Sequence, residues 1–251
     1  SPGLIDARAG VVRQAVNLDW QALPLRDLLQ DRYGVPVYLA NDSHAAALGE
    51  YTFGPHRGAA DLIVVKAGRG TSAGIVINGR LHYGDGSGAG EIGHVRVVEN
   101  GKTCLCGHRG CLETVVSSRA IVEKARAVFT ADPTSALHQF AQTESEITTY
   151  VVWQAFNAGD TAVAAIVQEI GCYLGRAVAN LIGALNIQTI MIAGSLARFG
   201  QPLLEAIRTE MEASAMSTLA AETTVRLSEL GEDIVMLGAA SLLLSNELGL
   251  V

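Results

Sequence analysis

Three cysteines and a histidine are clustered near the middle of the chain, with the spacing His94-x9-Cys104-x-Cys106-x4-Cys111. Zinc prefers four nitrogen and sulfur ligands in a tetrahedron, and three cysteines with one histidine form a common closed set. Thiolates are soft donors, which disfavours magnesium and calcium. Neighbouring cysteines in a chain of cytosolic type indicate metal ligands rather than disulfides. We therefore predict a structural Zn²⁺ held by these four residues.

Two alternatives to this metal site stay open at the level of the sequence. Three reduced cysteines beside an ordinary loop histidine would give the same pattern. His108 lies within the cysteine-rich segment and is an alternative fourth ligand. Glycines at 101, 107 and 110 give the segment backbone freedom, so that it can wrap a small ion.

Three carboxylates stand beside predicted turns and element ends. Asp42 follows a β-rich run and precedes an Ala-rich helix, where ligands gather in parallel α/β sheets. Glu91 and Glu113 flank the metal segment, so a folded metal loop would bring them close together. With Asn41 they suit a polyhydroxyl ligand, because its hydroxyls donate hydrogen bonds to carboxylates. The alternative is that Asp42 only caps a helix and that both glutamates face solvent.

The hydrophobic pattern alternates between strands and helices around these residues. Apolar residues recur every three to four positions over 166–185, which is typical of a long helix. This alternation predicts a largely parallel α/β sheet. Helices are predicted at 25–32, 41–50, 118–129, 145–157, 166–185, from about 201 and at 236–244, strands at 35–39, 62–66, 189–193 and 225–227, and a hairpin at 74–83.

Length and composition limit the class of protein. The 251 residues suffice for one large domain or two modest ones. Apolar residues make up 49% and charged residues 17%, a soluble globular composition. The net charge of −7 argues against a general binder of nucleic-acid backbones. No run of about 18 apolar residues is present, so we expect no membrane partner and a cytoplasmic location.

Several motifs resemble those of the ROK family of repressors, open reading frames and sugar kinases. The stretch NDSHAAALGE at 41–50 resembles one family signature. AGEIGH at 89–94 and CLCGHRGCLE at 104–113 resemble two others. The resemblance covers essentially the whole chain, because the segments 2–6, 17–20, 230–233 and 238–240 match as well.

The resemblance implies an α/β fold of the actin/hexokinase-like (ribonuclease H-like) type, with two lobes around a cleft. Because the chain opens at Ser1 without a methionine, we expect the N-terminal lobe to be truncated. The rest of that lobe would comprise residues 1–59 and 236–251. The C-terminal lobe would comprise residues 60–235, with the zinc loop at 94–111.

The resemblance also implies which residues bind the ligand. Asn41, Asp42, Glu91, His94 and Glu113 would bind sugar hydroxyls. His94 would also hold the metal, since an imidazole has two nitrogens. In a family kinase, Asp42 would be the general base that accepts the proton of the attacking hydroxyl.

The phosphate-binding turn departs from the family pattern. Family kinases carry a turn resembling Gly-Thr-Gly-Ile-Gly, and this chain has Gly68-Arg69-Gly70-Thr71-Ser72. Arg69 replaces a hydroxyl and Ser72 replaces a glycine, which would hinder the approach of backbone to phosphate. We therefore expect a degraded phosphate turn at Gly68, Arg69 and Gly70. The alternative is that Arg69 reaches the nucleotide phosphates as a cation. His44 replaces an asparagine, without a functional explanation from the sequence.

These departures favour a sugar-binding effector domain of a ROK transcriptional regulator, which binds a hexose or an N-acetylhexosamine without phosphorylating it. DNA would then be contacted only through an upstream domain. The alternative is an ATP-dependent, glucokinase-like sugar kinase that uses ATP and Mg²⁺. A relative with a purely structural role is a third hypothesis. By family resemblance, we expect a homodimer or a homotetramer.

Overall fold

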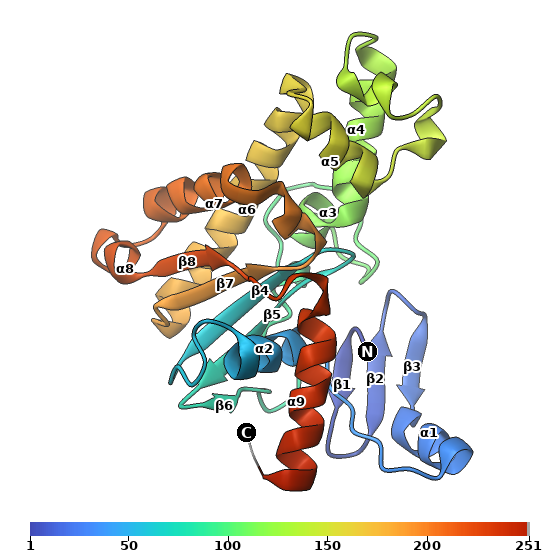
Figure 1. The fold of residues 1–251 in the computed structure, drawn as a ribbon, viewed down its shortest axis with the longest axis vertical. Coiled ribbons are helices and arrows are strands. Elements are labelled where there is room, and N and C mark those ends of the chain that lie inside the picture. Colours follow the sequence, from blue (N-terminus) through green and yellow to red (C-terminus); the bar gives the residue numbers. More distant parts are fainter. Residues whose placement is uncertain (250–251) are drawn as a thin grey trace.

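A five-stranded sheet forms the centre of the protein, and helices cover both of its faces (Figure 1). The structure is a computed structural model that describes residues 1–249. The strand order is β6-β5-β4-β7-β8. The strands are β4 (Leu62–Ala67), β5 (Thr71–Ile77), β6 (Arg80–Leu81), β7 (Thr189–Ala193) and β8 (Thr224–Leu227).

The sheet is mixed, so the prediction of a largely parallel sheet is wrong for half of it. β4 pairs with β7 in parallel, as β7 does with β8. β4 pairs with β5 antiparallel, as β5 does with β6. The short turn after Ala67 requires this, because a parallel connection needs a crossover of a dozen or more residues. The hairpin predicted at 74–83 therefore lies within the sheet.

Helices α2 (Asp42–Phe53) and α9 (Ile234–Leu248) cover one face of the sheet and pack tightly on each other. Their close approach depends on glycine. A Cβ atom on Gly238 would lie 1.6 Å from the carbonyl oxygen of Ala45. Ala46 and Ala47 face the buried Leu62 and Val64 of β4. The small residues of α2 therefore fix its N-terminus against the end of β4.

The other face carries the larger core, built mainly on α6 (Thr161–Leu185) and α7 (Gly200–Ser214). Among the described helices, α6 is the one with the length and hydropathy of a membrane span, but 56% of that window is buried inside the protein. Its close packing against α7 makes it a core helix. Further helices of the described residues are α3 (Glu113–Val116), α4 (Ser118–Ala131), α5 (Thr149–Asn157) and α8 (Ser217–Glu222).

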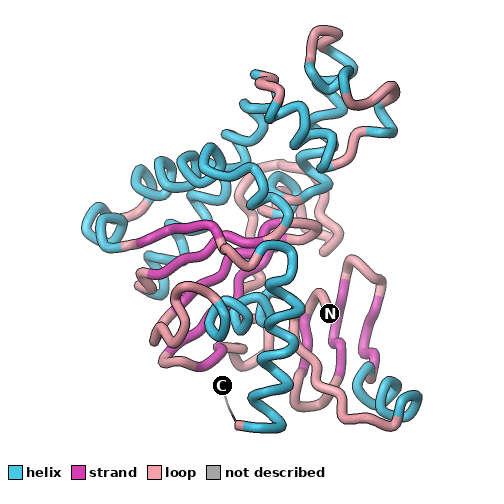
Figure 2. The backbone as a smooth tube through the Cα atoms, viewed as in Figure 1, coloured by secondary structure: helices cyan, strands magenta, loops and turns pink. Residues whose placement is uncertain are grey.

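A small antiparallel sheet precedes α2, with strands β1 (Leu4–Asp6), β2 (Val11–Ala15) and β3 (Trp20–Leu23), followed by α1 (Leu25–Tyr33). Figure 2 shows a loop between α1 and α2, where we predicted a strand at 35–39. That prediction is wrong. Pro36 has no N–H to donate to a ladder, and Val35 is 54% exposed. The predicted lobe boundaries stay a prediction, and residues 250–251 lie outside the described residues.

Candidate functional site

The N-terminus of α2 presents Asp42 to a cavity. Asn41 caps the helix, because its Oδ1 atom accepts hydrogen bonds from the backbone N–H of Ser43 at 2.8 Å and of His44 at 3.4 Å. The carboxylate of Asp42 is therefore not used as the cap. Its Oδ2 atom accepts a hydrogen bond from Nζ of Lys66 at 2.9 Å. The alternative of a merely capping Asp42 does not hold.

The other predicted sugar-binding residues meet at the same cavity. Its volume is about 250 Å³, and Asn41, Asp42, Glu91, His94 and Glu113 all line it. Asn41 donates to Oε1 of Glu91 at 3.5 Å, and Oε2 of Glu113 accepts from the N–H of Thr71 at 3.1 Å. The structure thus brings together predicted sugar-binding residues from three separate segments, 41–42, 91–94 and 113.

Burial raises the pKa of Glu91 above its ordinary value. His94 opposes this shift, and the carboxylates of Asp42 and Glu113 add to it. A cluster of three carboxylates and one amide in a small cavity offers many acceptors to a ligand rich in hydroxyl donors. The alternative that both glutamates only face solvent does not fit this placement.

The four predicted zinc ligands are also brought together. One ligand atom from each of His94, Cys104, Cys106 and Cys111 lies within 4.8 Å of all the others. The sulfur of Cys104 is 3.6 Å from Nδ1 of His94, and the sulfurs of Cys106 and Cys111 are 3.7 Å apart. All four cysteines of the chain are free thiols. Three sulfurs and one imidazole nitrogen fit a tetrahedral zinc ion.

His94 links the metal cluster to the cavity. Its Nδ1 atom faces the sulfurs, and its Nε2 atom lies 3.8 Å from Oε2 of Glu91. His108 is exposed and lies outside the cluster. Burial and the neighbouring cysteines raise the pKa of the Cys111 thiol to about 12. A bound cation would offset this by favouring the thiolates.

The predicted phosphate turn lies between β4 and β5. Gly68, Arg69 and Gly70 form its tip, and Arg69 is exposed. Ser72 is not part of the tip, because it pairs with Lys66 inside the sheet. A Cβ atom on Gly70 would lie 3.0 Å from Oε2 of Glu113. The turn therefore keeps its glycines at the two positions beside Arg69.

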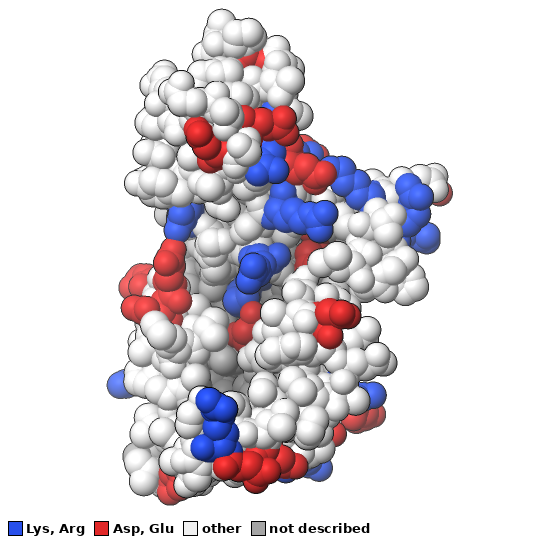
Figure 3. All heavy atoms as spheres, turned by 90° about the vertical axis from the view of Figure 1, so that its right-hand side faces the viewer, with Lys and Arg blue, Asp and Glu red and all other residues white. Residues whose placement is uncertain are grey.

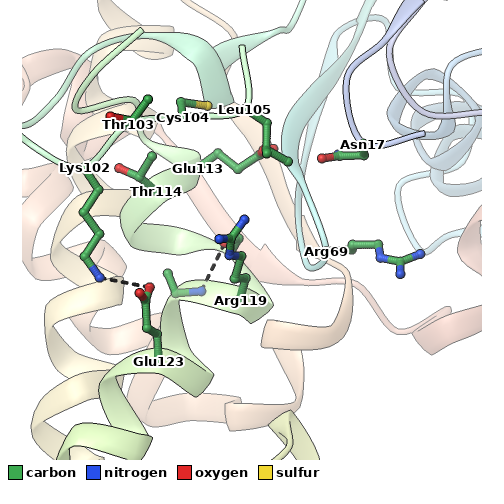
Figure 4. Close-up of a pocket in the computed structure, with 12 residues that line it drawn as sticks. Asn17, Arg69, Lys102, Thr103, Cys104, Leu105, Glu113, Thr114, Arg119 and Glu123 are labelled. Atoms are coloured by element: carbon green, nitrogen blue, oxygen red, sulfur yellow. Dashed lines mark hydrogen bonds and ion pairs between the residues drawn. The ribbon is translucent and has the colours of Figure 1, made fainter. Parts of the chain in front are cut away.

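A second cavity of about 280 Å³ adjoins the first and shares Asn17, Arg69 and Glu113 with it. Figure 4 shows Arg69 and Arg119 at this cavity, with Lys102 paired to Glu123 at its edge. Figure 3 shows cationic side chains gathered around a hollow on this side of the molecule. The cleft beside the predicted sugar site is therefore locally cationic, although the net charge is −7.

His44 is buried beside the sugar-site residues. Its Nε2 atom donates to the carbonyl oxygen of Ala89 at 3.2 Å, and its ring makes an edge contact with Tyr83. Burial lowers the pKa of His44. His44 thus ties α2 to the loop that carries Glu91.

Sequence reasoning missed two cavity residues, Lys66 and Asn17. Lys66 had a signal, since it is the only charged residue in the otherwise apolar run LIVVKA. Asn17 lies in the segment 17–20 that resembles the family, but that resemblance assigned no role to it, and its turn belongs to a sheet that the hydrophobic pattern did not predict.

Comparison with known proteins identifies relatives along the whole chain. The sequence profile of the ROK family matches residues 1–246. A glucokinase of Halalkalibacterium halodurans is 37% identical over 98% of this chain and 75% of that protein. A xylose repressor of Caldicellulosiruptor bescii is 31% identical over 98% of this chain and 62% of that protein. The chain thus spans about three quarters of the glucokinase and less than two thirds of the repressor.

Comparison with solved structures also finds members of the ROK family. The crystal structure of a ROK family glucokinase from Streptomyces griseus, in complex with glucose and AMPPNP, matches with a TM-score of 0.90 and 32% identity. The match covers 96% of this chain and 78% of that chain. The expected α/β fold of the actin/hexokinase-like type is thereby confirmed.

The hypothesis of a regulator's effector domain is wrong. It rested on a damaged phosphate turn, but Ser72 lies in a strand and both tip glycines are kept. The glucokinase is more similar to the chain than the xylose repressor is, at 37% against 31% identity. The kinase alternative is therefore the better supported one. Both kinds of relative share one family, and this chain belongs to the ROK family.

Proposed function

We propose that this chain forms the sugar-binding and catalytic part of an ATP-dependent hexose kinase, with glucose as the first substrate to test. The observation that carries the proposal is the position of Asp42. Its carboxylate faces a small cavity whose other polar groups suit sugar hydroxyls. The similarity to glucokinases, one of them solved with glucose and AMPPNP, supports the same function.

In the proposed reaction, Asp42 accepts the proton of the sugar hydroxyl that attacks the γ-phosphorus of ATP. Asn41, Glu91, His94 and Glu113 bind the remaining hydroxyls and fix the ring. Orientation of this kind supplies much of the barrier lowering in phosphoryl transfer, where the protein itself does little covalent chemistry.

The turn at Gly68–Gly70 is the proposed contact for the nucleotide phosphates. Its glycines allow close approach of backbone N–H groups. Arg69 makes no hydrogen bond or ion pair with the described residues, so its guanidinium is free to bind a phosphate oxygen. Mg²⁺ bound with ATP would neutralise charge on the β- and γ-phosphates.

The zinc ion, held by His94, Cys104, Cys106 and Cys111, has a proposed structural role. It would fix the loop that lies between Glu91 and Glu113, and so hold both carboxylates at the cavity. A cytoplasmic location fits this proposal, since the thiolates need a reducing compartment.

The test is a coupled ADP-release assay with full-length protein and a panel of glucose, mannose, galactose, N-acetylglucosamine and N-acetylmannosamine. We expect turnover in the range of about 1–100 s⁻¹ for at least one sugar. A protein that binds one of these sugars but releases no ADP with any of them would contradict the proposal.

A further inference from the structure

Lys66 lies at the end of β4, on the face of the sheet that packs against α2. Leu62 and Val64 of the same face are fully buried beneath that helix. The next outward position on this face carries the ammonium group, directly below the N-terminus of α2. Strand β4 thus places the ammonium group of Lys66 beside Asp42, the proposed base.

The ammonium group is paired with the base itself. Nζ of Lys66 lies 2.9 Å from Oδ2 of Asp42, and the two side chains are only 15% and 26% exposed. Removing an ammonium group from water is costly unless it is paired and hydrogen-bonded. Asp42 is the only hydrogen-bond partner of the Lys66 ammonium group among the described residues. Two N–H donors of Lys66 therefore stay available at the cavity that it lines.

The Lys–Glu pairs of the described chain are more exposed than this Lys–Asp pair. Lys124 pairs with Glu169 at 2.7 Å, with side chains 29% and 45% exposed and neither at the sugar cavity. Exposed pairs of this kind contribute little to stability. The Lys66 pair is more deeply buried, and both of its members line the proposed reaction site. The position of the Lys66 pair therefore favours a role in the reaction over that of a surface ion pair.

We propose that Lys66 is a positioning residue for the transfer step, an inference that rests on the proposed kinase function. By holding Oδ2, it turns Oδ1 of Asp42 toward the acceptor hydroxyl. The acceptor oxygen forms a bond to the γ-phosphorus while the bond from that phosphorus to the β–γ bridging oxygen breaks. The electron pair of the broken bond leaves with ADP, and the hydroxyl proton passes to Oδ1 of Asp42.

A cation such as the ammonium group of Lys66 lowers the basicity of a carboxylate beside it, but phosphoryl transfer can proceed with a weaker base. The transition state of phosphoryl transfer is loose in most analyses, so the acceptor needs orientation more than early deprotonation. A carboxylate fixed in position should therefore speed the transfer more than a carboxylate that is more basic but mobile. The ammonium group of Lys66 also places a fixed positive charge near the acceptor oxygen and the β–γ bridging oxygen, between which negative charge shifts during transfer.

The experiment compares Lys66→Met, Lys66→Arg and the matched control Lys124→Met in the full-length protein. For each, kcat and KM come from ADP release with glucose, or with whichever sugar of the panel turns over. The Kd for that sugar comes from calorimetry. We expect Lys66→Met to lower kcat by about 10²-fold, the loss typical of a misplaced catalytic group, with KM and Kd changed far less. Lys66→Arg should recover part of kcat, and Lys124→Met should match the wild type.

Four results would overturn the assignment. An unchanged kcat in Lys66→Met, beside an active wild type, would reject Lys66 alone. Loss of sugar binding in proportion to kcat, or no recovery with arginine in a variant that still binds sugar, would show a merely structural pair. A wild type that binds sugar but shows no turnover would reject the kinase function itself, and this inference with it.

Discussion

The Nε2 atom of His94 lies 3.8 Å from Oε2 of Glu91, on the side of the ring opposite the metal cluster. The Nδ1 atom of the same ring lies 3.6 Å from the sulfur of Cys104. One imidazole therefore belongs both to the proposed zinc site and to the proposed sugar site. Any change that loosens the metal loop should also move a sugar-binding group.

Cys106→Ala is predicted to remove zinc and weaken sugar binding together. The wild type should hold about one equivalent of zinc after purification without added metal, as measured by elemental analysis. Cys106→Ala should lose most of it, and calorimetry should show weaker binding of sugar. Cys172→Ala, in α6 and outside the cluster, is the control and should keep both properties. A zinc-free wild type with full sugar affinity would contradict this coupling.

Glu91→Gln and Glu113→Gln should each weaken sugar binding by about 1–3 kcal/mol. Each change replaces a carboxylate acceptor and leaves ligand hydroxyls imperfectly paired in a buried site. Calorimetry with the preferred sugar measures the loss, with the exposed Glu169→Gln as the matched control. If both cavity variants kept the affinity of the control, the ligand would have to bind elsewhere.

His44 should make the fold less stable in mild acid. Burial holds its folded-state pKa below the ordinary value of 6.5, while hydrogen bonding to Ala89 and the charge of Asp42 oppose this and His82 adds to it. The unfolded chain therefore binds more protons between the two pKa values. The stabilising contribution is fully present above about pH 6.5 and is lost as the pH falls toward the folded-state pKa.

Urea unfolding of wild type and His44→Asn over pH 5–7.5 isolates this contribution, because other titrating groups are common to both proteins. The free energy of unfolding of the wild type should fall more steeply with acidification than that of the variant. Parallel curves for the two proteins would show that His44 does not titrate differently in the folded state.

Gly238→Ala should disrupt the contact between α9 and α2. The new methyl group would lie 1.6 Å from the carbonyl oxygen of Ala45, so the two helices would have to separate. Overpacking of this kind costs about 1–3 kcal/mol of unfolding free energy, or more. Gly183→Ala in α6 meets no atom within 4 Å and should instead stabilise by about 0.5–1 kcal/mol. Equal urea midpoints for the two variants would contradict the close helix contact.

The sequence predicts the long elements of this fold well and the small sheet poorly. The three-to-four spacing over 166–185 lies within α6, and the apolar run at 189–193 is β7. The sheet β1–β3 was not predicted, because its core has only three buried residues, Ile5, Val12 and Ala15. Three residues give too weak an alternation to be recognised along the chain.

The sequence predicts those residues of the proposed site that lie in motifs, but not the contacts between residues that are far apart in the sequence. The motif at 41–50 located Asp42, and the flanking positions of Glu91 and Glu113 located the cavity wall. The contact between Lys66 and Asp42 spans 24 residues of sequence and depends on how α2 packs over β4. The error about the phosphate turn had a similar origin, since only the strand register shows that Ser72 lies outside the tip.

The central claim is that Asp42 acts as the base of a sugar kinase, and turnover of Asp42→Asn tests it most directly. Asparagine keeps the size and a hydrogen-bonding oxygen but does not accept the proton. With the preferred sugar and ATP, we expect kcat to fall by about 10²–10⁴-fold relative to wild type, while calorimetry still detects sugar binding. A variant that turns over at the wild-type rate would contradict the account.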